Sequence, residues 1–276
     1  MNCGLTLLSH SPESATVSIN TEVVSARLRR PQLGIRKLFT MTREPHLPDR
    51  VAARRRPVGW PLMYQSWDKL LFLHWKVPMD VLRPLIPEPL GIDTFQGEAY
   101  IAITPLTLWN VRPAFVPPLP WLSSFHELNV RTYVYYDGIP GVWFFSLDAN
   151  RTLPVLGART FFHLPYFDAS IDLATKRDTH TFHHSRTTDE RARFDAEWTP
   201  AGEEFRAAPG SLEFFLIERY CLYTAHDDEI YRCRINHEAW PLRLAKLHNW
   251  SGTILRPTGF QHRRSTRSPT LADPST

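Results

Sequence analysis

The stretch that decides the fold is Glu127-Leu128-Asn129-Val130-Arg131-Thr132-Tyr133-Val134-Tyr135-Tyr136, in which polar and apolar residues alternate. Side chains of a β-strand point to opposite faces with a period of two residues. One face of this strand therefore carries Glu127, Asn129, Arg131, Tyr133 and Tyr135. The opposite face carries Leu128, Val130, Thr132 and Val134. The alternation predicts a β-strand with one polar face and one apolar face.

The segments around this strand predict a mainly β (α+β) domain. Asp137-Gly138 separates the strand from a second β-prone run, which is typical of a hairpin. Short helices are expected over residues 79–86 and over 212–218, where Ser211 is a good N-cap residue. Short strands with many turns favour a barrel or a sandwich. The further strands are expected at 70–74, 97–104, 142–147, 158–162, 219–224 and 231–235.

Composition divides the chain into three parts. Residues 1–60 and 256–276 are rich in basic residues and lack sustained apolar periodicity, so we expect a disordered or non-native extension and a disordered, atypical tail. The domain between them, 61–255, has more acidic than basic residues, although the whole chain has a net charge of +4. A mildly acidic domain should not attract phosphates strongly, so nucleic acid is not the expected partner.

Cysteine usage and hydropathy indicate the compartment. The 3 cysteines are widely spaced and form no C-x-x-C pair, which argues against a disulfide framework and against a thiolate zinc site. No stretch approaches the eighteen or so apolar residues that a membrane span requires. We therefore expect a cytoplasmic protein with no membrane partner.

Several strings together resemble the YqjF-like family of uncharacterised bacterial proteins. They begin with Phe125-His126-Glu127-Leu128-Asn129 and continue with Gly141-Val142-Trp143-Phe144-Phe145-Ser146-Leu147-Asp148-Ala149 and with Gly157-Ala158-Arg159. Leu164-Pro165-Tyr166-Phe167 and His237-Glu238-Ala239-Trp240-Pro241-Leu242 are similar to further motifs of that family. The resemblance runs from about Trp67 to Lys246.

The resemblance implies a fold similar to that of acetoacetate decarboxylase, a curled antiparallel sheet that forms a cone or barrel around a central pocket. In that decarboxylase a lysine forms a Schiff base with a keto acid. This sequence departs from that pattern, because no lysine lies between Glu127 and Thr175. A second departure begins at Asn249, where the sequence becomes basic. We interpret it as a frameshift or truncation that removes a last strand, and the unpaired edge would favour a homodimer.

The polar face of the first strand supplies the candidate site. Glu127 is the candidate catalytic residue, since a carboxylate can accept or relay a proton. An arginine can bind a ligand carboxylate through two hydrogen bonds. The ligand-binding candidates are Asn129, Arg131, Tyr133, Asp148, Arg159 and Arg219. The alternatives are an internal ion-pair network, a solvent-facing surface, or a direct pair between Asp148 and Arg159.

No cofactor or metal is expected. On a strand His180 and His184 would share one face with His183 opposite, and no carboxylate or cysteine pattern completes a metal site. Phosphate-binding glycine loops, hydrolase elbows and zinc-protease motifs are absent from the sequence.

These observations favour a protein that binds a small organic acid or carbonyl compound, with proton-transfer chemistry as one option. A non-catalytic small-molecule binding protein is the alternative, and nucleic-acid contact through the basic tails is another. The sequence leaves open whether the protein is an enzyme.

Overall fold

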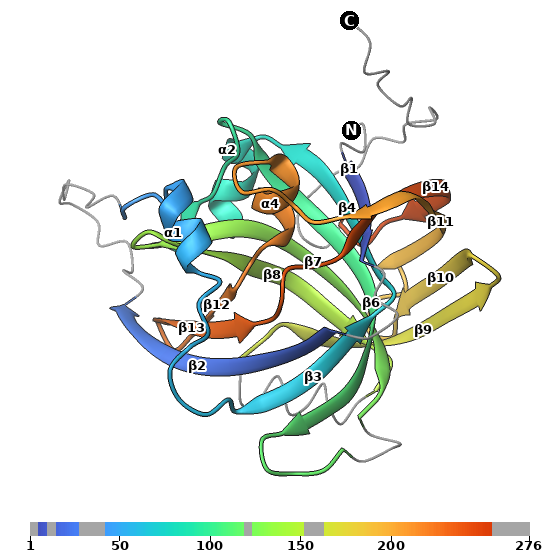
Figure 1. Ribbon diagram of the computed structural model, residues 1–276, viewed down its shortest axis with the longest axis horizontal. Helices are drawn as coiled ribbons and strands as arrows, with labels where there is room; N and C mark the ends of the chain where they lie inside the picture. Colours follow the sequence, from blue (N-terminus) through green and yellow to red (C-terminus); the bar gives the residue numbers. More distant parts are fainter. Residues whose placement is uncertain (1–4, 10–14, 28–41, 119–122, 152–162, 256–276) are drawn as a thin grey trace, which may run out of the picture.

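The computed structural model describes residues 5–9, 15–27, 42–118, 123–151 and 163–255. In these ranges the strands form one 14-stranded sheet that curls strongly, and the short helices lie at one end of it (Figure 1). The helices are α1 (Leu47–Ala52), α2 (Met79–Leu82), the 3-10 helix η1 (Arg83–Leu85) and α4 (Leu212–Ile217). The strands are β1 (Leu5–Ser9), β2 (Ala15–Arg27), β3 (Met63–Asp68), β4 (Leu70–Val77), β5 (Gly91–Ile92), β6 (Ala99–Pro113), β7 (Phe125–Tyr136), β8 (Ile139–Ala149), β9 (Tyr166–Lys176), β10 (Thr179–Arg186), β11 (Arg193–Phe205), β12 (Cys221–His226), β13 (Glu229–Asn236) and β14 (Leu242–Gly252).

The strand pairings close into two rings. The rings share the strands β6, β7 and β8, which we call the shared wall. The first ring runs through β12, β13, β2, β3, β6, β7 and β8, and β8 pairs with β12. The second ring runs from β6 through β4, β1, β14, β11, β10 and β9 back to β8 and β7. The mainly β prediction and the curled sheet are confirmed. The sheet is mixed, however, because β8 is parallel to both β12 and β9.

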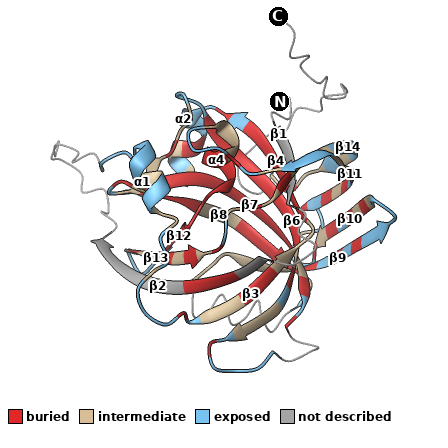
Figure 2. Cartoon of the chain, viewed as in Figure 1, coloured by how far each residue is buried: buried red, intermediate tan, exposed pale blue. Residues whose placement is uncertain are grey.

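The shared wall is buried on both faces, as the red central strands of Figure 2 show. Leu128 and Val130 of β7 belong to a hydrophobic cluster built mainly from strands of the second ring. Phe125 and Tyr133 of β7 belong to the cluster of the first ring. Alternate residues of β7 therefore serve two cores. The polar face expected from the sequence is an interior face and does not point to solvent.

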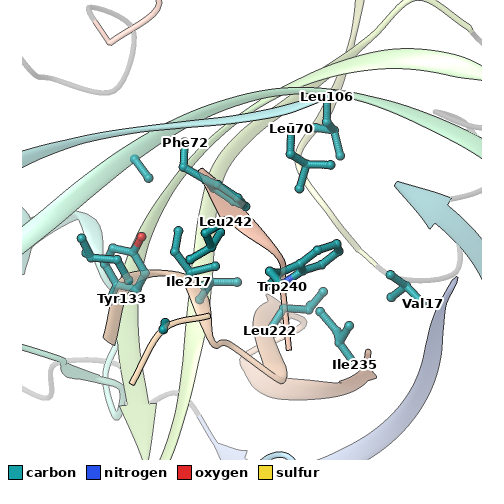
Figure 3. Close-up of a cluster of buried hydrophobic side chains, with 14 of the residues drawn as sticks. Val17, Leu70, Phe72, Leu106, Tyr133, Ile217, Leu222, Ile235, Trp240 and Leu242 are labelled. Carbon is teal, nitrogen blue, oxygen red and sulfur yellow. The ribbon is translucent and has the colours of Figure 1, made fainter. Parts of the chain in front are cut away.

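The helix α4 contributes side chains to the hydrophobic core that the strands of the first ring surround. Ser211 caps this helix, since its Oγ accepts a hydrogen bond from the backbone N–H of Phe214 at 3.1 Å, as the sequence predicts. All four residues from Phe214 to Ile217 are buried. Figure 3 shows Ile217 and Trp240 among the side chains that fill this core.

Residues 5–9, 15–27 and 42–60 differ from the disordered extension that we expected over 1–60. β1 pairs with β4 and β14, and β2 pairs with β3 and β13, so both strands lie within the sheet. The segment that contains α1 is anchored by ion pairs, described below. The expectation of disorder was wrong for these ranges. They are joined to the rest of the domain by backbone pairing between strands and by arginine ion pairs, and neither kind of contact requires apolar periodicity. The remaining parts of 1–60, and the tail 256–276, lie outside the described residues.

In the C-terminal region a strand continues past the position where the sequence departs from the family pattern. β14 runs through Asn249 to Gly252 and pairs with β11 along its length, whereas β1 pairs only with Leu242, Arg243 and Leu244. The homodimer expected from an unpaired edge stays a prediction. The departure in sequence at Asn249 does not interrupt the strand.

Candidate functional site

The candidate site lies on the inner face of β7, within the first ring. Glu127, Asn129, Arg131 and Tyr133 share this face, and each has an exposed fraction of 6% or less. On the neighbouring strand β6, Thr104 is the register partner of Asn129, so the two side chains share one face of the sheet. The alternation read from the sequence therefore brings four of the predicted residues together. The structure places them in the interior, which excludes the solvent-facing alternative.

Glu127 is a buried carboxyl group, with an exposed fraction of 4%. The hydroxyl of Tyr166, at the start of β9, donates a hydrogen bond to Glu127 Oε2 at 2.7 Å. Burial raises the pKa of Glu127 to about 7, although hydrogen bonds from Tyr166 and Asn129 partly oppose the effect. Both protonation states of the carboxyl group are therefore populated near neutral pH, as a general acid or base requires.

Three polar atoms on this inner face lack a hydrogen-bond partner among the described residues. They are Thr104 Oγ1, Asn129 Oδ1 and Arg131 Nε. A buried polar atom without a partner costs about 1–3 kcal/mol, so such atoms are uncommon and usually have a functional explanation. Their grouping next to Glu127 indicates a place where a polar molecule or water completes the hydrogen bonds.

Arg131 and Tyr133 extend the polar row toward the helical end. The guanidinium of Arg131 lies over the ring of Phe72, 5.4 Å from its centroid. The hydroxyl of Tyr133 is 2.9 Å from His74 Nε2 on β4. Burial raises the pKa of Tyr133, and the charges of Arg131 and Arg219 act against that rise. The phenol is thus held between two guanidinium groups.

Asp148 lies on the opposite face of the wall from Glu127. In the register of β7 and β8 it faces Leu128, whereas Glu127 faces Ala149. Its carboxylate accepts hydrogen bonds from Arg186 at 2.8 Å and from His184 at 2.9 Å. Burial alone would raise the pKa of Asp148, but these hydrogen bonds outweigh it and hold that pKa below its usual value. Asp148 therefore belongs to an ion-pair network of the second ring.

The remaining two candidates have different outcomes. Arg159, proposed as a partner of Asp148 or as part of the pocket, lies outside the described residues. Arg219 is buried beside α4, and its Nη1 donates to Asp93 Oδ2 at 2.6 Å. Arg50 from α1 donates to both carboxylate oxygens of the same Asp93, at 2.7 and 2.6 Å.

Sequence reasoning missed several residues of this region. Asp93 follows the two-residue strand β5, and Tyr166 is the first residue of β9, so no preceding periodicity marks either side chain as inward. Thr104 ended a predicted strand but was treated as a strand former only. Arg50 lay in the segment read as an extension. An acidic residue after a proline-rich turn, as at Asp93, is a weak signal that could have prompted a search for its arginine partners.

No lysine among the described residues is buried. Lys76, Lys176 and Lys246 are exposed, and Lys69 is half-buried at the turn between β3 and β4. No group of three or more possible metal ligands occurs within these ranges. His180 and His184 share a buried face of β10 and His183 is exposed opposite them, as the strand pattern predicts.

Glu127 lines neither of two surface cavities that described residues bound. One, of about 190 Å³, lies between α1 and α4 and is lined in part by Arg50, Phe95 and Phe215. The other, of about 340 Å³, lies at the ends of β9 and β10 and includes Lys69 and Arg243. No helix within the described ranges is long and apolar enough to span a membrane.

This chain is similar over part of its length to several solved structures. One similar structure is acetoacetate decarboxylase from Legionella pneumophila, with a TM-score of 0.43, 10% identity, and coverage of 64% of this chain and 80% of that one. Another is the enduracididine biosynthesis enzyme MppR complexed with pyruvate, with a TM-score of 0.44, 11% identity, and coverage of 71% and 91%. A third is an acetoacetate decarboxylase-like enzyme from Sphingomonas wittichii RW1, with a TM-score of 0.45, 10% identity, and coverage of 67% and 89%.

The chain belongs to the DUF2071 family of uncharacterised conserved proteins, whose sequence profile matches residues 64–275. It is 44% identical over 204 residues to the uncharacterised protein YqjF of Bacillus subtilis (strain 168). That match covers 74% of this chain and 84% of YqjF. The resemblance to the YqjF-like family is therefore confirmed.

Proposed function

We propose that the protein binds a small organic acid or carbonyl compound on the inner face of β7 and moves a proton on it. The observation that carries this proposal is the group of three unsatisfied polar atoms, on Thr104, Asn129 and Arg131, beside a carboxyl group that titrates near neutral pH. A ligand carboxylate and carbonyl oxygen would accept hydrogen bonds from the Thr104 hydroxyl and from Arg131 Nε, and a water molecule would donate one to Asn129 Oδ1.

Each residue has a distinct role in this proposal. Arg131 binds the carboxylate of the ligand, because its buried guanidinium is a charge-assisted donor. Glu127 removes a proton from the carbon next to the carbonyl group. The electron pair of that C–H bond moves onto the carbonyl oxygen and gives an enolate. Return of the proton from Glu127 to the same or another atom completes a proton exchange or an isomerisation. Tyr166 holds the carboxyl group of Glu127 in place.

Solvent deuterium exchange tests the proton transfer directly. The full chain is incubated with 2-oxobutanoate in D2O, and loss of the signal of the protons on carbon 3 is followed by NMR. We expect exchange well above the buffer rate, and a loss of at least about a hundredfold in Glu127→Gln, the size typical of an acid–base residue. Glu98→Gln, which changes an exposed glutamate, is the matched control and should leave the rate unchanged.

Binding separates this proposal from the non-catalytic alternative. If 2-oxobutanoate stabilises the protein against heat and Arg131→Met abolishes the shift, the site binds the acid. If wild type binds the acid but exchanges its protons only at the buffer rate, and Glu127→Gln leaves binding unchanged, the protein is a binding protein without turnover. A cooperative melt that no 2-oxo, 2-hydroxy or simple carboxylic acid shifts would contradict the proposed site.

A further inference from the structure

The buried carboxylate of Asp93 is shared by two arginines, so within the described ranges one of the two positive charges has no carboxylate of its own. Arg50 and Arg219 both donate to Asp93, and the side chains of the three residues are exposed by 14%, 3% and 3%, in the order Arg50, Arg219, Asp93. Isolated buried charges are costly, so arginines in such places usually have one carboxylate each. This cluster is one anion short among the described residues.

Arg219 is the guanidinium with unused hydrogen-bonding capacity. Its Nη1 donates to Asp93, and its Nε donates to the backbone oxygen of Phe215 at 2.6 Å. Its Nη2 is buried and has no hydrogen-bond partner among the described residues. Burial, with the nearby charge of Arg50, lowers the pKa of Arg219 despite the attraction of Asp93. The missing anion would therefore sit most favourably against Arg219.

Arg219 also lies next to the proposed ligand site. Its guanidinium stacks over the ring of Tyr133, 4.8 Å from the centroid, and over the ring of Phe215, 4.3 Å from the centroid. Tyr133 is the same residue whose phenol is close to Arg131. The two guanidinium groups thus flank one tyrosine side chain. Each has a buried nitrogen, Nε in Arg131 and Nη2 in Arg219, for which the described part of the chain supplies no hydrogen-bond partner.

A cavity lies beside the cluster of Arg50, Arg219 and Asp93. The cavity of about 190 Å³ between α1 and α4 is lined by Arg50 and by Phe215, whose ring contacts Tyr133 at a centroid distance of 5.5 Å. A water molecule occupies roughly 30 Å³ of liquid, so this space holds several waters or a carboxylate group. The guanidinium groups of both arginines lie over the Phe215 ring, 5.0 Å from its centroid for Arg50 and 4.3 Å for Arg219.

We propose that Arg219, supported by Arg50, forms a second anion subsite, so that the ligand of this protein is a small dicarboxylic acid. One carboxylate would be held by Arg131 and the other by Arg219, on either side of Tyr133. This inference rests on the proposed function, because it assigns the class of acid that the inner face of β7 binds. It adds the requirement for two anionic groups in one molecule.

Matched pairs of acids test the proposal in the full chain. Succinate, glutarate and adipate are compared by calorimetric titration with butyrate, valerate and hexanoate, which have the same carbon numbers and one carboxylate. We expect at least one dicarboxylate to bind wild type tenfold or more tightly than its matched monocarboxylate. The chain length that binds best reports the spacing of the two guanidinium groups.

Variants assign the two subsites. Arg219→Met leaves Arg50 and Asp93 as a one-to-one pair, so we expect it to fold, to bind monocarboxylates as wild type does, and to lose the preference for dicarboxylates. Arg219→Lys keeps the charge and should retain part of that preference. Arg131→Met should weaken the binding of both classes. Arg243→Met, which removes a donor to the carbonyl oxygen of Gly202, is the matched arginine control.

The outcomes separate this inference from the proposed function. If monocarboxylates bind wild type and Arg131→Met abolishes that binding, but dicarboxylates bind no more tightly, the second subsite is wrong and the proposed function stands. A dicarboxylate preference that survives in folded Arg219→Met would also overturn the subsite. If no acid of either class binds folded wild type, the proposed function fails together with the subsite. The wild-type comparison requires no variant, so a variant that does not fold leaves the test decisive.

Discussion

A single buried carboxyl group should make the stability of this protein depend on pH. Burial raises the pKa of Glu127 from 4.5 to about 7. Between these values the unfolded chain has released the proton of Glu127 while the folded protein keeps it. The free energy of unfolding therefore falls as pH rises through this window, by about 3 kcal/mol from this residue.

The variant Glu127→Gln should remove that contribution, because an amide does not titrate. We expect the wild type to lose about 3 kcal/mol more than the variant between pH 4.5 and pH 7.5, measured by urea denaturation at each pH. Glu98→Gln should follow the wild type, since Glu98 is exposed. Parallel stability curves for wild type and Glu127→Gln would show that Glu127 is ionised in the folded protein well below neutral pH.

Residue identities in the candidate site could be predicted from the sequence, but their partners could not. Period two placed Glu127, Asn129, Arg131 and Tyr133 on one face, because this rule depends only on backbone geometry. The partner of Glu127 is Tyr166, which is 39 residues away. The sheet puts Asp148 on the other side of the wall, because β8 pairs with β7 in a register that has a bulge. Register and bulges follow from packing that no local pattern records.

At the scale of elements, α1 is a helix held by charge and stacking more than by burial. None of its residues is buried. Just beyond its end, Arg54 forms an ion pair with the buried carboxylate of Glu218 at 3.2 Å and lies 4.8 Å from the centroid of the Phe214 ring. Within it, Arg50 reaches Asp93. Ion pairs of two arginines thus hold this helical segment against the end of the first ring.

Removing one of these ion pairs should lower the free energy of unfolding of the whole protein. In Arg54→Met, Glu218 keeps the hydroxyl of Tyr220 and the backbone N–H of Trp240 as donors but loses its cation. A buried carboxylate without its partner charge costs about 3 kcal/mol, somewhat less here because Arg54 is 31% exposed. Guanidinium denaturation would measure this loss. The neighbouring Arg55→Met alters an exposed side chain and should stay within about 0.5 kcal/mol of wild type. Equal midpoints for the two variants would show that this ion pair does not hold the helical segment.

At the scale of the whole molecule, the change from basic to acidic composition near residue 60 does not mark the boundary of the folded domain. Ten basic residues in the first sixty predict a solvated extension, since long basic stretches usually lie in water. Two of them, Arg50 and Arg54, instead neutralise carboxylates that the domain buries. The acidic excess of residues 61–255 and the basic excess of residues 1–60 are therefore partly two halves of one set of ion pairs. Charge balance between segments is a long-range property that composition by segment cannot show.

The boundary of the folding unit follows from this arrangement and can be tested by truncation. A chain of residues 61–276 lacks β2, which separates β3 from β13 in the first ring, and lacks β1, which separates β4 from β14 in the second. Four strands then have open edges, and Asp93 and Glu218 lose arginine partners. Open edges favour pairing with other chains, so we expect this fragment to aggregate or to melt without cooperativity. A chain of residues 1–255 removes none of the described strands and should keep the melting temperature of the full chain. Calorimetry and light scattering on both fragments decide the point. A soluble 61–276 fragment with a cooperative melt near that of the full chain would show that the two N-terminal strands are not required for the fold.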